Sequence, residues 1–507
     1  MKKNKLFLIA FALLGLLVSC DDAINIKQPG EVNNPDDVYK TIDDLERGVQ
    51  GVYAVFRTES TIEFTSIFTD EIKIGKQNGG QGLNDGLYNF QLNAGSDVAT
   101  SIWGSNYSLI NFTNRIIEAG LKIAPTEDVD DPNFNEGDLT DYRYAMGQLY
   151  AIRAFAHFQL LSYFSTDLKN DSALGVMIAD KVPSNNYDTY LPRSTNAECF
   201  AFIEADLDLA EEFISPAVYA TLVSPDFITA LRARMAAYRG KYTDALRYAN
   251  LLADPTIYPF IGAANYFDIW SDTANDEIIF KLARVNGDSQ VGAIFASASS
   301  SATGSPFFEV SRSLYDRFDD NDTRKGLSLI DATSTPVDNP DTDPNYLKDD
   351  LLVINKYPGN TAQSDPLLND IKVFRVSEMY LIKAEAYAAA NQLNGASNSV
   401  AAMLKRIRDA RYLTGAPVLP TFATATEAWA AILDERRKEL AFEGFRYLDI
   451  KRLGVLAGGK GIERYSRDCE RYGSCTLDPT DHRFTLPIPT TELTANPNIR
   501  GQQNPGY

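Results

Sequence analysis

The sequence predicts a mainly α-helical protein in which tetratricopeptide-like helix pairs carry a loop-rich part with few short strands. Two observations support this fold class. Ser224–Arg239 and Lys241–Ala253 form a helical hairpin about Gly240, and the residue pattern fits the middle and end of a tetratricopeptide unit. Phe374–Ala390 and Gly395–Arg411 form a second, looser pair. Two approximate units do not make a regular solenoid, but they favour stacked helix pairs against which loops are mounted.

Apolar residues at helical spacing predict the other helices. In Tyr142–Phe164 the apolar residues run nearly all round, so we expect this helix at the centre of the fold. Ile278–Val285 is a candidate short strand, and Ala124–Asp141 is an acidic linker. The remaining predicted helices are Asp37–Arg57, Ser101–Lys122 and Thr195–Phe213, the last with Thr195 or Asn196 as its N-cap.

The most charged segment, Ile432–Gly454, is predicted to be one long helix with an apolar stripe. Gly444 in its interior should cost about 1 kcal/mol relative to Ala, which suggests that another backbone passes close by. The charges could do acid–base chemistry, or they could pair with neighbouring segments of a scaffold. Alternating signs favour the scaffold. Opposite charges stand three residues apart at Asp434–Arg437, Arg436–Glu439, Glu443–Arg446 and Asp449–Arg452.

Composition limits the classes of protein to which the chain can belong. The chain has 507 residues, of which 44% are apolar and 23% charged, so a large core can form. The formal net charge is −20. Nucleic-acid binding needs a basic face, so we expect no nucleic-acid partner. Acidity alone identifies no other partner.

The N-terminus predicts export and lipidation. Lys2, Lys3 and Lys5 precede the apolar run Leu6–Leu17, which has the length of a signal-peptide core and is too short to span a bilayer. Leu17–Cys20 then fits a lipobox, so residues 1–19 would be a lipoprotein signal peptide and Cys20 would carry the lipid, palmitate included. The alternative is an ordinary signal peptide with a chance cysteine. Residues 20–36 are polar and serve as a tether to the membrane surface.

Two loop regions are candidates for ligand binding. Lys76–Phe90 and Tyr266–Phe308 combine aromatic residues with amides and charges, a combination that suits the apolar faces and hydroxyls of sugars. The alternative for each aromatic residue is core packing, which we favour for Trp103 and Trp270. The use of Phe in place of Trp or Tyr is compatible with a peptide ligand as well as with a sugar. The predicted ligand-binding residues are Gln77, Asn78, Tyr88, Phe295, Phe307 and Phe308.

Nothing in the sequence predicts catalysis or a cofactor. There are two histidines, and His157 fits a core position in its helix. The chain has many acidic residues, and residue types alone cannot show whether two of them form the catalytic pair of a glycosidase. Such a pair needs a defined separation between its two carboxylates. Asp319–Asp322 and Asp268–Asp276 could hold a structural calcium, but neither has EF-hand spacing, and solvated acidic turns are favoured. We therefore expect no metal and no enzyme activity.

Three cysteines remain after Cys20. Cys469 and Cys475 flank a five-residue segment that a disulfide could close in an oxidising exterior. Cys199 lies in a helical pattern and is expected to be a buried thiol.

Three segments together resemble the RagB/SusD family of Bacteroidota surface lipoproteins. They are the lipobox followed by Asp21-Asp22, the run ERRKELAFEGFRYLDIKRLG from Glu435, and the tail from Pro487 with PIP, NPN and QNPGY. The resemblance implies four tetratricopeptide-like helix pairs plus a loop-rich ligand-binding part. It also implies a SusD-like N-terminal part over residues 37–225 and a RagB/SusD C-terminal part over 226–507, forming one integrated globular unit.

The resemblance further implies a function. Such a protein is anchored by lipid to the outer membrane, faces outward, captures oligosaccharides and passes them to a SusC-like TonB-dependent transporter. A RagB-like protein that captures oligopeptides is the alternative within the family. A surface glycan hydrolase and a structural adhesin are alternatives from other classes.

Overall fold

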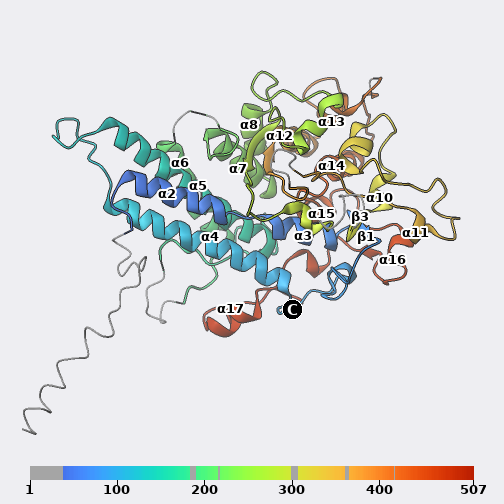
Figure 1. The fold of residues 1–507 in the computed structure, drawn as a ribbon, viewed down its shortest axis with the longest axis horizontal. Helices are drawn as coiled ribbons and strands as arrows, with labels where there is room; N and C mark the ends of the chain where they lie inside the picture. Colours follow the sequence, from blue (N-terminus) through green and yellow to red (C-terminus); the bar gives the residue numbers. More distant parts are fainter. Residues whose placement is uncertain are drawn as a thin grey trace, which may run out of the picture.

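The computed structural model describes residues 38–182, 190–214, 217, 219–297, 306–359, 365–415 and 417–507. The predicted signal peptide, the lipid on Cys20 and the tether lie outside these residues. Figure 1 shows a helical body with loops gathered toward one end. In the described part, each helix is too short or too polar to cross a bilayer.

The helices follow the predicted order, with additional short ones between them. The main helices are α2 (Ile42–Val55), α3 (Glu59–Phe68), α4 (Asp97–Lys122), α5 (Glu136–Phe164), α6 (Asn196–Phe213), α7 (Pro225–Tyr238), α8 (Tyr242–Leu252), α12 (Val376–Ala389), α13 (Val400–Arg411), α14 (Ala425–Glu439) and α15 (Arg446–Leu453). Single-turn or short helices are α9 (Phe267–Trp270), α10 (Arg312–Tyr315), α11 (Tyr346–Asp349), α16 (Ser466–Cys469) and α17 (Thr490–Ala495), with tighter or wider turns η2 (Leu87–Asn89), η3 (Ala263–Asn265), η4 (Val291–Ile294), η5 (Arg324–Leu329) and η7 (His482–Phe484).

Helix α5 is the centre of the helical part, as the sequence predicts. Nearly every residue from Ala145 to Phe164 is buried, and the helix packs against α2, α4 and α6. Its N-cap Asn135 accepts hydrogen bonds from two backbone N–H groups, so the helix begins six residues earlier than the apolar pattern alone indicates. Thr195 caps α6 with a reciprocal bond to Glu198, as predicted.

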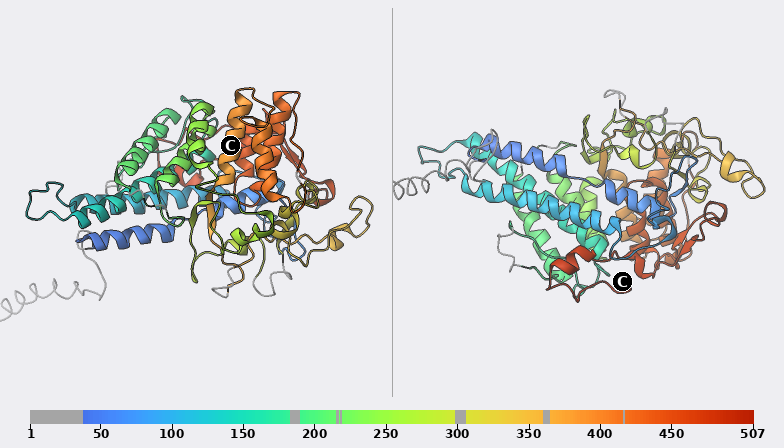
Figure 2. Two further views of the ribbon diagram at one scale, coloured as in Figure 1. Left: turned by 90° about the horizontal axis from the view of Figure 1, so that it is seen from above. Right: turned by 60° about the horizontal axis from the view of Figure 1, so that its bottom comes forward.

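The second helix group stacks beside the first. Helices α7 and α8 form the predicted hairpin, and Gly240 between them has φ +69°, a backbone conformation that favours glycine. Helix α12 packs against α8, α13 and α14 and so links this hairpin to the C-terminal helices. Figure 2 (left) shows the green and orange helices standing side by side above the long blue and cyan ones.

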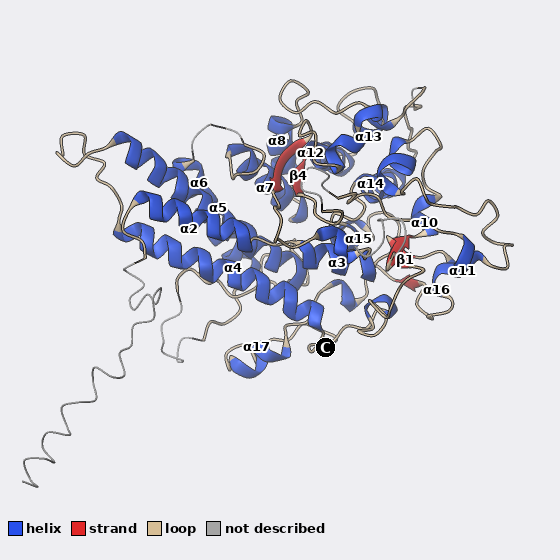
Figure 3. Ribbon diagram, viewed as in Figure 1, coloured by secondary structure: helices blue, strands red, loops and turns tan. Residues whose placement is uncertain are grey.

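The strands are short and come in antiparallel pairs, coloured red in Figure 3 where they are visible. Strand β2 begins at Ile278 as predicted. The pairs are β1 (Ile72–Ile74) with β3 (Phe308–Val310), β2 (Ile278–Leu282) with β4 (Ile371–Arg375), and β5 (Ile462–Glu463) with β6 (Thr476–Leu477). Each pair connects two segments that are separated by loops, so the strand pairs stabilise the loop-rich part.

An aromatic core joins the helical groups to the strands. Phe155 of α5 contacts Phe56 at a ring-centroid distance of 5.1 Å and Phe227 of α7 at 6.0 Å. Phe227 in turn meets Phe280 of β2 at 4.8 Å and Phe374 of β4 at 5.3 Å. All five rings are buried, and edge-to-face pairs of this kind add stability beyond their buried area.

The prediction of one helix over Ile432–Gly454 is wrong. Helix α14 ends at Glu439 and α15 begins at Arg446. Between them Phe442 has φ +63° and Gly444 φ +86°, so the chain turns sharply. A Cβ on Gly444 would meet its nearest neighbours, on Thr61 and Ile62, at ordinary contact distances of 3.5–3.6 Å. The glycine is therefore required by backbone conformation, and not by a close approach.

Helix α3 is not among the helices predicted from the sequence. It precedes the Gly- and Asn-rich stretch, and its residues Ile62, Phe64 and Phe68 all pack into the core. The segment Gly75–Gly86 forms turns. Cys469 and Cys475 are joined by a disulfide, and Cys199 is a buried free thiol.

We predict that Gly444→Ala destabilises the protein by about 1–2 kcal/mol, because an L-residue with a side chain disfavours the left-handed backbone region. The measurement is the free energy of unfolding by chemical denaturation. Gly104→Ala in the middle of α4 is the matched control: its added methyl meets nothing within 4 Å, so it should stabilise by about 1 kcal/mol. Equal effects of the two substitutions would contradict the assignment.

Candidate ligand-binding surface

Buried ion pairs at the end of α14 explain the charged segment. Glu439 accepts hydrogen bonds from Arg411 at 2.8 and 3.1 Å, from Arg375 at 3.0 Å and from Arg324 at 3.0 Å. The side chains are at most 2% exposed. The surrounding arginines hold the pKa of Glu439 well below its usual range despite burial. A carboxylate committed to three cations is a structural group, so the scaffold interpretation is confirmed.

Three of the four predicted pairs within this segment are replaced by other pairs, most of them with other parts of the chain. Asp449 and Arg452 do meet, at 3.0 Å. Arg446 instead binds Asp70 through two hydrogen bonds of 2.8 and 3.0 Å. The other new partners are Arg317 for Asp434, Glu385 and Asp449 for Arg436, and Arg375 and Lys356 for Glu443. The turn between α14 and α15 redirects these side chains.

Two buried acids near this network have raised pKa values. Burial raises the pKa of Glu71 to about 7 and that of Asp468 to about 6. Glu71 is 0% exposed and Asp468 is 2% exposed. Asp468 accepts hydrogen bonds from Tyr346 at 2.6 Å and from the backbone N–H of Arg312 at 2.9 Å. Both acids lie inside the protein, where a glycosidic bond cannot reach them.

The predicted loop and the strand that follows the second predicted region lie against each other. The backbone N–H of Gly75 donates to the carbonyl of Phe307 at 2.9 Å, and that of Gln77 donates to Pro306 at 3.0 Å. The amide of Asn78 also donates to the Phe307 carbonyl at 3.0 Å. The β1–β3 pair therefore continues into the loop and brings Gln77, Asn78 and Phe307 together.

These three residues differ in what they offer a ligand. Gln77 is exposed, and Phe307 is partly exposed at the edge of the core. Asn78 is half-buried, and its amide also binds the Gln81 carbonyl and the Gly80 N–H, so it shapes the loop. Gln77 and Phe307 are the parts of the prediction that remain available at this surface.

Tyr88, Phe295 and Phe308 were predicted as ligand-binding residues in exposed loops, but all three are buried, with at most 3% of each exposed. The Tyr88 ring lies 3.9 Å from the guanidinium of Arg464, and its hydroxyl donates to the Asp468 carbonyl. Phe295 stacks on Tyr357 at 5.9 Å, and Phe308 lies within β3. Irregular segments can be covered by other loops, and here their aromatic residues join the same hydrophobic core as the helices.

Further along the same loop lie exposed polar side chains that are not among the predicted ligand-binding residues. The amides of Gln81, Asn84, Gln91 and Asn93 and the carboxylate of Asp85 are exposed, whereas the apolar residues between them mostly point inward. The Gln and Asn content of the loop was the available signal. Side-chain amides donate and accept in one plane, which suits neighbouring sugar hydroxyls. We define the amide loop as residues 76–93.

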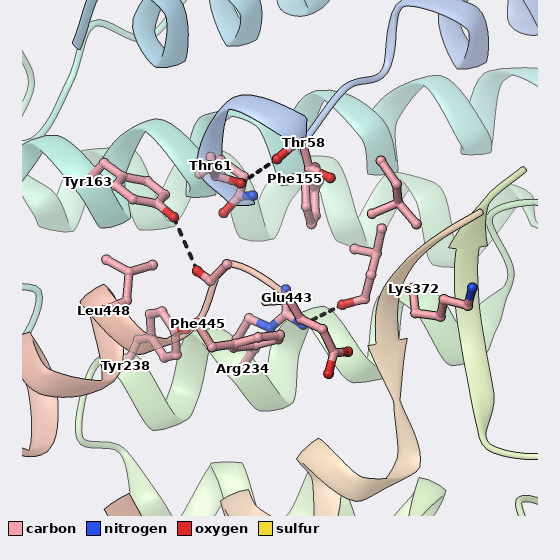
Figure 4. A pocket seen from close by; sticks show the side chains of 14 residues that line it. Thr58, Thr61, Phe155, Tyr163, Arg234, Tyr238, Lys372, Glu443, Phe445 and Leu448 are labelled. Carbon is pink, nitrogen blue, oxygen red and sulfur yellow. Dashed lines mark hydrogen bonds between the residues drawn. The ribbon is translucent and has the colours of Figure 1, made fainter. Parts of the chain in front are cut away.

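A cavity at the junction of the helical groups is too small for a sugar ring. It has a volume of about 40 Å³, which is room for water molecules. Figure 4 shows Tyr163 donating across it to the Gly444 carbonyl, with Thr61, Phe155 and Arg234 around it. Its polar lining suits buried water and supports the turn between α14 and α15.

The acidic stretches considered for calcium bind protein cations and hydroxyls. Asp322 pairs with Arg324 at 2.6 Å and Asp320 with Lys325 at 2.7 Å. In the second stretch Asp272 pairs with Lys372 at 2.5 Å. Among the residues the structure describes, no group of three or more metal-ligating side chains gathers. His157 is a core residue, as expected: its ring binds the Arg153 carbonyl and the Ala179 N–H, and burial lowers its pKa to about 4.

Comparison with known proteins finds matching family models and relatives of similar sequence. A family model described as the SusD family matches residues 348–507, and one described as starch-binding and associating with the outer membrane matches residues 26–238. SusD-like protein P2 of Formosa agariphila is 26% identical over the full length of both chains. SusD-like protein P38 of the same organism is 25% identical over 89% of this chain and 92% of its own.

Solved structures agree with the sequence matches. A SusD superfamily protein from Bacteroides vulgatus superposes with a TM-score of 0.72 at 22% identity, covering 92% of this chain and all of its own. A laminarin-binding SusD-like protein superposes with a TM-score of 0.66 at 22% identity and the same coverage. The two matching family models are both of the SusD kind and together cover most of the chain, so the chain belongs to the SusD/RagB family, and the predicted mainly helical fold class is confirmed.

We predict that Glu71→Gln reduces the pH dependence of stability. Because the pKa of Glu71 is raised on folding, the folded protein keeps a proton that the unfolded chain releases, so stability falls as pH rises from about 4.5 to about 7. Glutamine stays neutral and can still accept from the Phe442 N–H. Between about pH 5 and about pH 8 the variant should gain on the order of 2 kcal/mol relative to the parent. Parallel curves of unfolding free energy against pH would refute this assignment.

Proposed function

We propose that this protein captures oligosaccharides at the cell surface and passes them to a SusC-like TonB-dependent transporter in the outer membrane. It binds its ligand on the amide loop beside Phe307 and breaks no bond. The observation that carries the proposal is that the β1–β3 strand pair and the hydrogen bonds beyond it hold this amide-rich loop next to the partly exposed ring of Phe307.

The geometry suits capture because the loop is ordered before a ligand arrives. Backbone hydrogen bonds fix it at Gly75 and Gln77, and the Asn78 amide braces it from within. A loop held in this way loses little conformational entropy on binding. The exposed amides can then bind hydroxyls while Phe307 contacts the apolar face of a ring.

The comparisons support a carbohydrate ligand. One matching family model is described as starch-binding, and one structural neighbour is described as laminarin-binding. Starch and laminarin oligosaccharides are therefore the first probes. An oligopeptide remains the second candidate, because the aromatic ring at this surface is a phenylalanine, which suits apolar side chains as well as sugars.

We predict that Gln77→Ala combined with Phe307→Ala weakens oligosaccharide binding at least tenfold, a loss of about 1.4 kcal/mol. The full chain is titrated by calorimetry in a detergent without a sugar headgroup, and the mixture is checked for hydrolysis. Phe112→Ala is the control, since this ring is 36% exposed on α4 and lies beside Gly51 of α2. Unchanged affinity of the double variant would refute the site. Binding of peptides without binding of oligosaccharides would identify the ligand as a peptide. Turnover of the glycan would refute the binding-only role.

The proposed membrane attachment rests on Cys20, and the proposed transporter partner rests on the family resemblance. We predict that Cys20→Ala abolishes labelling by palmitate and releases the protein from the outer-membrane fraction. The measurement is metabolic labelling with fractionation, and Cys199→Ala is the control, because that thiol is buried. Co-purification of a TonB-dependent transporter with the parent chain supports the hand-over. Retention of Cys20→Ala in the membrane would contradict the lipid anchor.

A further inference from the structure

The side chain of Arg464, which follows β5, joins three separate segments beneath the amide loop. The residue is buried, with 6% of it exposed. Its five N–H groups all donate to backbone carbonyls, so none is left for a carboxylate. The acceptors are the carbonyls of Ile67, Phe68, Thr69, Tyr88 and Ser474. Buried charges are normally paired with an opposite charge, so this arrangement has a specific cause.

The first three acceptors form the C-terminal end of α3. The last carbonyls of a helix have no partner within the helix, and α3 ends at Phe68. The Arg464 Nε donates to Thr69 at 2.9 Å, and its Nη2 donates to Ile67 at 3.0 Å and to Phe68 at 3.1 Å. The negative end of the helix dipole also stabilises a cation at this position. The end of α3 therefore takes the place of a carboxylate partner.

The fourth acceptor lies in the amide loop. The Arg464 Nη1 donates to the Tyr88 carbonyl, and the guanidinium lies over the rings of Tyr88 at 3.9 Å and Phe90 at 4.4 Å. The Tyr88 N–H in turn donates to the Gly82 carbonyl at 2.8 Å, which encloses the turn that carries the exposed Asn84. Because α3 leads through β1 into this loop, one side chain joins the chain before the loop to the chain near its end.

The fifth acceptor lies in the loop that the Cys469–Cys475 disulfide closes. The Arg464 Nη1 donates to the Ser474 carbonyl at 2.9 Å. Tyr472 of the same loop packs edge-on against Tyr88, with a ring-centroid distance of 5.5 Å. Figure 1 shows α16, which ends at the first of these cysteines, beside β1 at the loop-rich end. A disulfide restricts the conformations of the loop it closes, so it keeps these contacts in place.

We propose that Arg464 is the positioning residue of the amide loop, and that the Cys469–Cys475 disulfide holds the contacts through which it acts. The inference rests on the proposed function, because it takes the amide loop as the ligand-binding surface. Arg464 touches no ligand, since it is buried and all its donors are committed. It fixes the turn at Tyr88 and with it the exposed amides of Asn84 and Gln91. A loop fixed in advance loses less conformational entropy when a ligand binds.

The test compares Arg464→Lys with Arg193→Lys in the full chain, in a detergent without a sugar headgroup. Lysine keeps the charge but lacks the planar set of five donors. Arg193 is the matched control, because it is also buried, with 5% exposed, and all its donors serve neutral oxygens outside the amide loop. These are the carbonyls of Phe164, Leu174, Gly175 and Gln502 and the amide oxygen of Asn504.

The first measurement is hydrogen–deuterium exchange of backbone amides without ligand, read by mass spectrometry of peptides that cover residues 76–93. Arg464→Lys should speed this exchange at least tenfold, because the end of the loop loses several hydrogen bonds. Arg193→Lys should leave it at the parent rate. Peptides from α7 report any general loss of stability in both variants.

Two further variants test the link to the disulfide. Cys469→Ser combined with Cys475→Ser opens the loop and should speed exchange of residues 76–93 about fivefold. Tyr88→Phe keeps the ring on the guanidinium but loses the hydroxyl bond to the Asp468 carbonyl, so it should act in the same direction. This milder variant decides the role of the junction if Arg464→Lys does not fold.

The second measurement is calorimetric titration with laminarin and starch oligosaccharides, whose affinity should fall about fivefold in Arg464→Lys and stay at the parent value in Arg193→Lys. Equal exchange of the amide loop in these two variants, or faster exchange with unchanged affinity, would overturn the positioning role. Exchange at the parent rate in the double serine variant would overturn the part assigned to the disulfide. A parent chain that binds no oligosaccharide would refute the proposed function, whereas the exchange rates decide independently whether Arg464 holds the loop.

Discussion

The pairing of Glu439 with Arg324, Arg375 and Arg411 is the interaction on which the rest of this structure depends. Burying a carboxylate is costly unless cations and hydrogen bonds replace its water. Here each cation comes from a different element: β4, α13 and the segment after α10. The charge can be buried only when all three elements are docked at the end of α14. Losing one partner would leave an unpaired buried charge, at a cost of about 3–5 kcal/mol.

The turn after Glu439 extends this network toward the proposed ligand-binding surface. Phe442 and Gly444 reverse the chain, so that Glu443 binds Arg375 and Lys356 while Arg446 binds Asp70. Asp70 immediately precedes Glu71 and β1, and β1 leads directly into the amide loop. The buried charges thus hold the base of the loop, although none of them faces a ligand. A scaffold of this kind can present a binding surface on irregular backbone without losing its shape.

The distribution of acidic side chains is consistent with the proposed binding role. The acids with raised pKa values, Glu71 and Asp468, are enclosed by core side chains, and the acids around Glu439 are committed to arginines. What reaches the surface at the loop is mostly neutral, namely amides and the edge of Phe307, with Lys76 and Asp85 as the exposed charges. Neutral amides and rings bind hydroxyl-rich ligands while leaving their bonds intact.

Sequence alone determined the helical body, because periodic apolar residues, the Thr195 cap and Gly240 act over a few residues. It also located the amide-rich loop, whose composition forbids a regular element. It did not determine where α14 stops, because apolar spacing continues through the turn at Phe442 and Gly444. Nor could it show that Tyr88, Phe295 and Phe308 are buried while Gln77 and Phe307 meet across β1–β3. The β1–β3 pair and the burial of Tyr88 join segments more than two hundred residues apart in the chain, and the ion pairs of Glu439 join separate elements, so tertiary structure alone decided them.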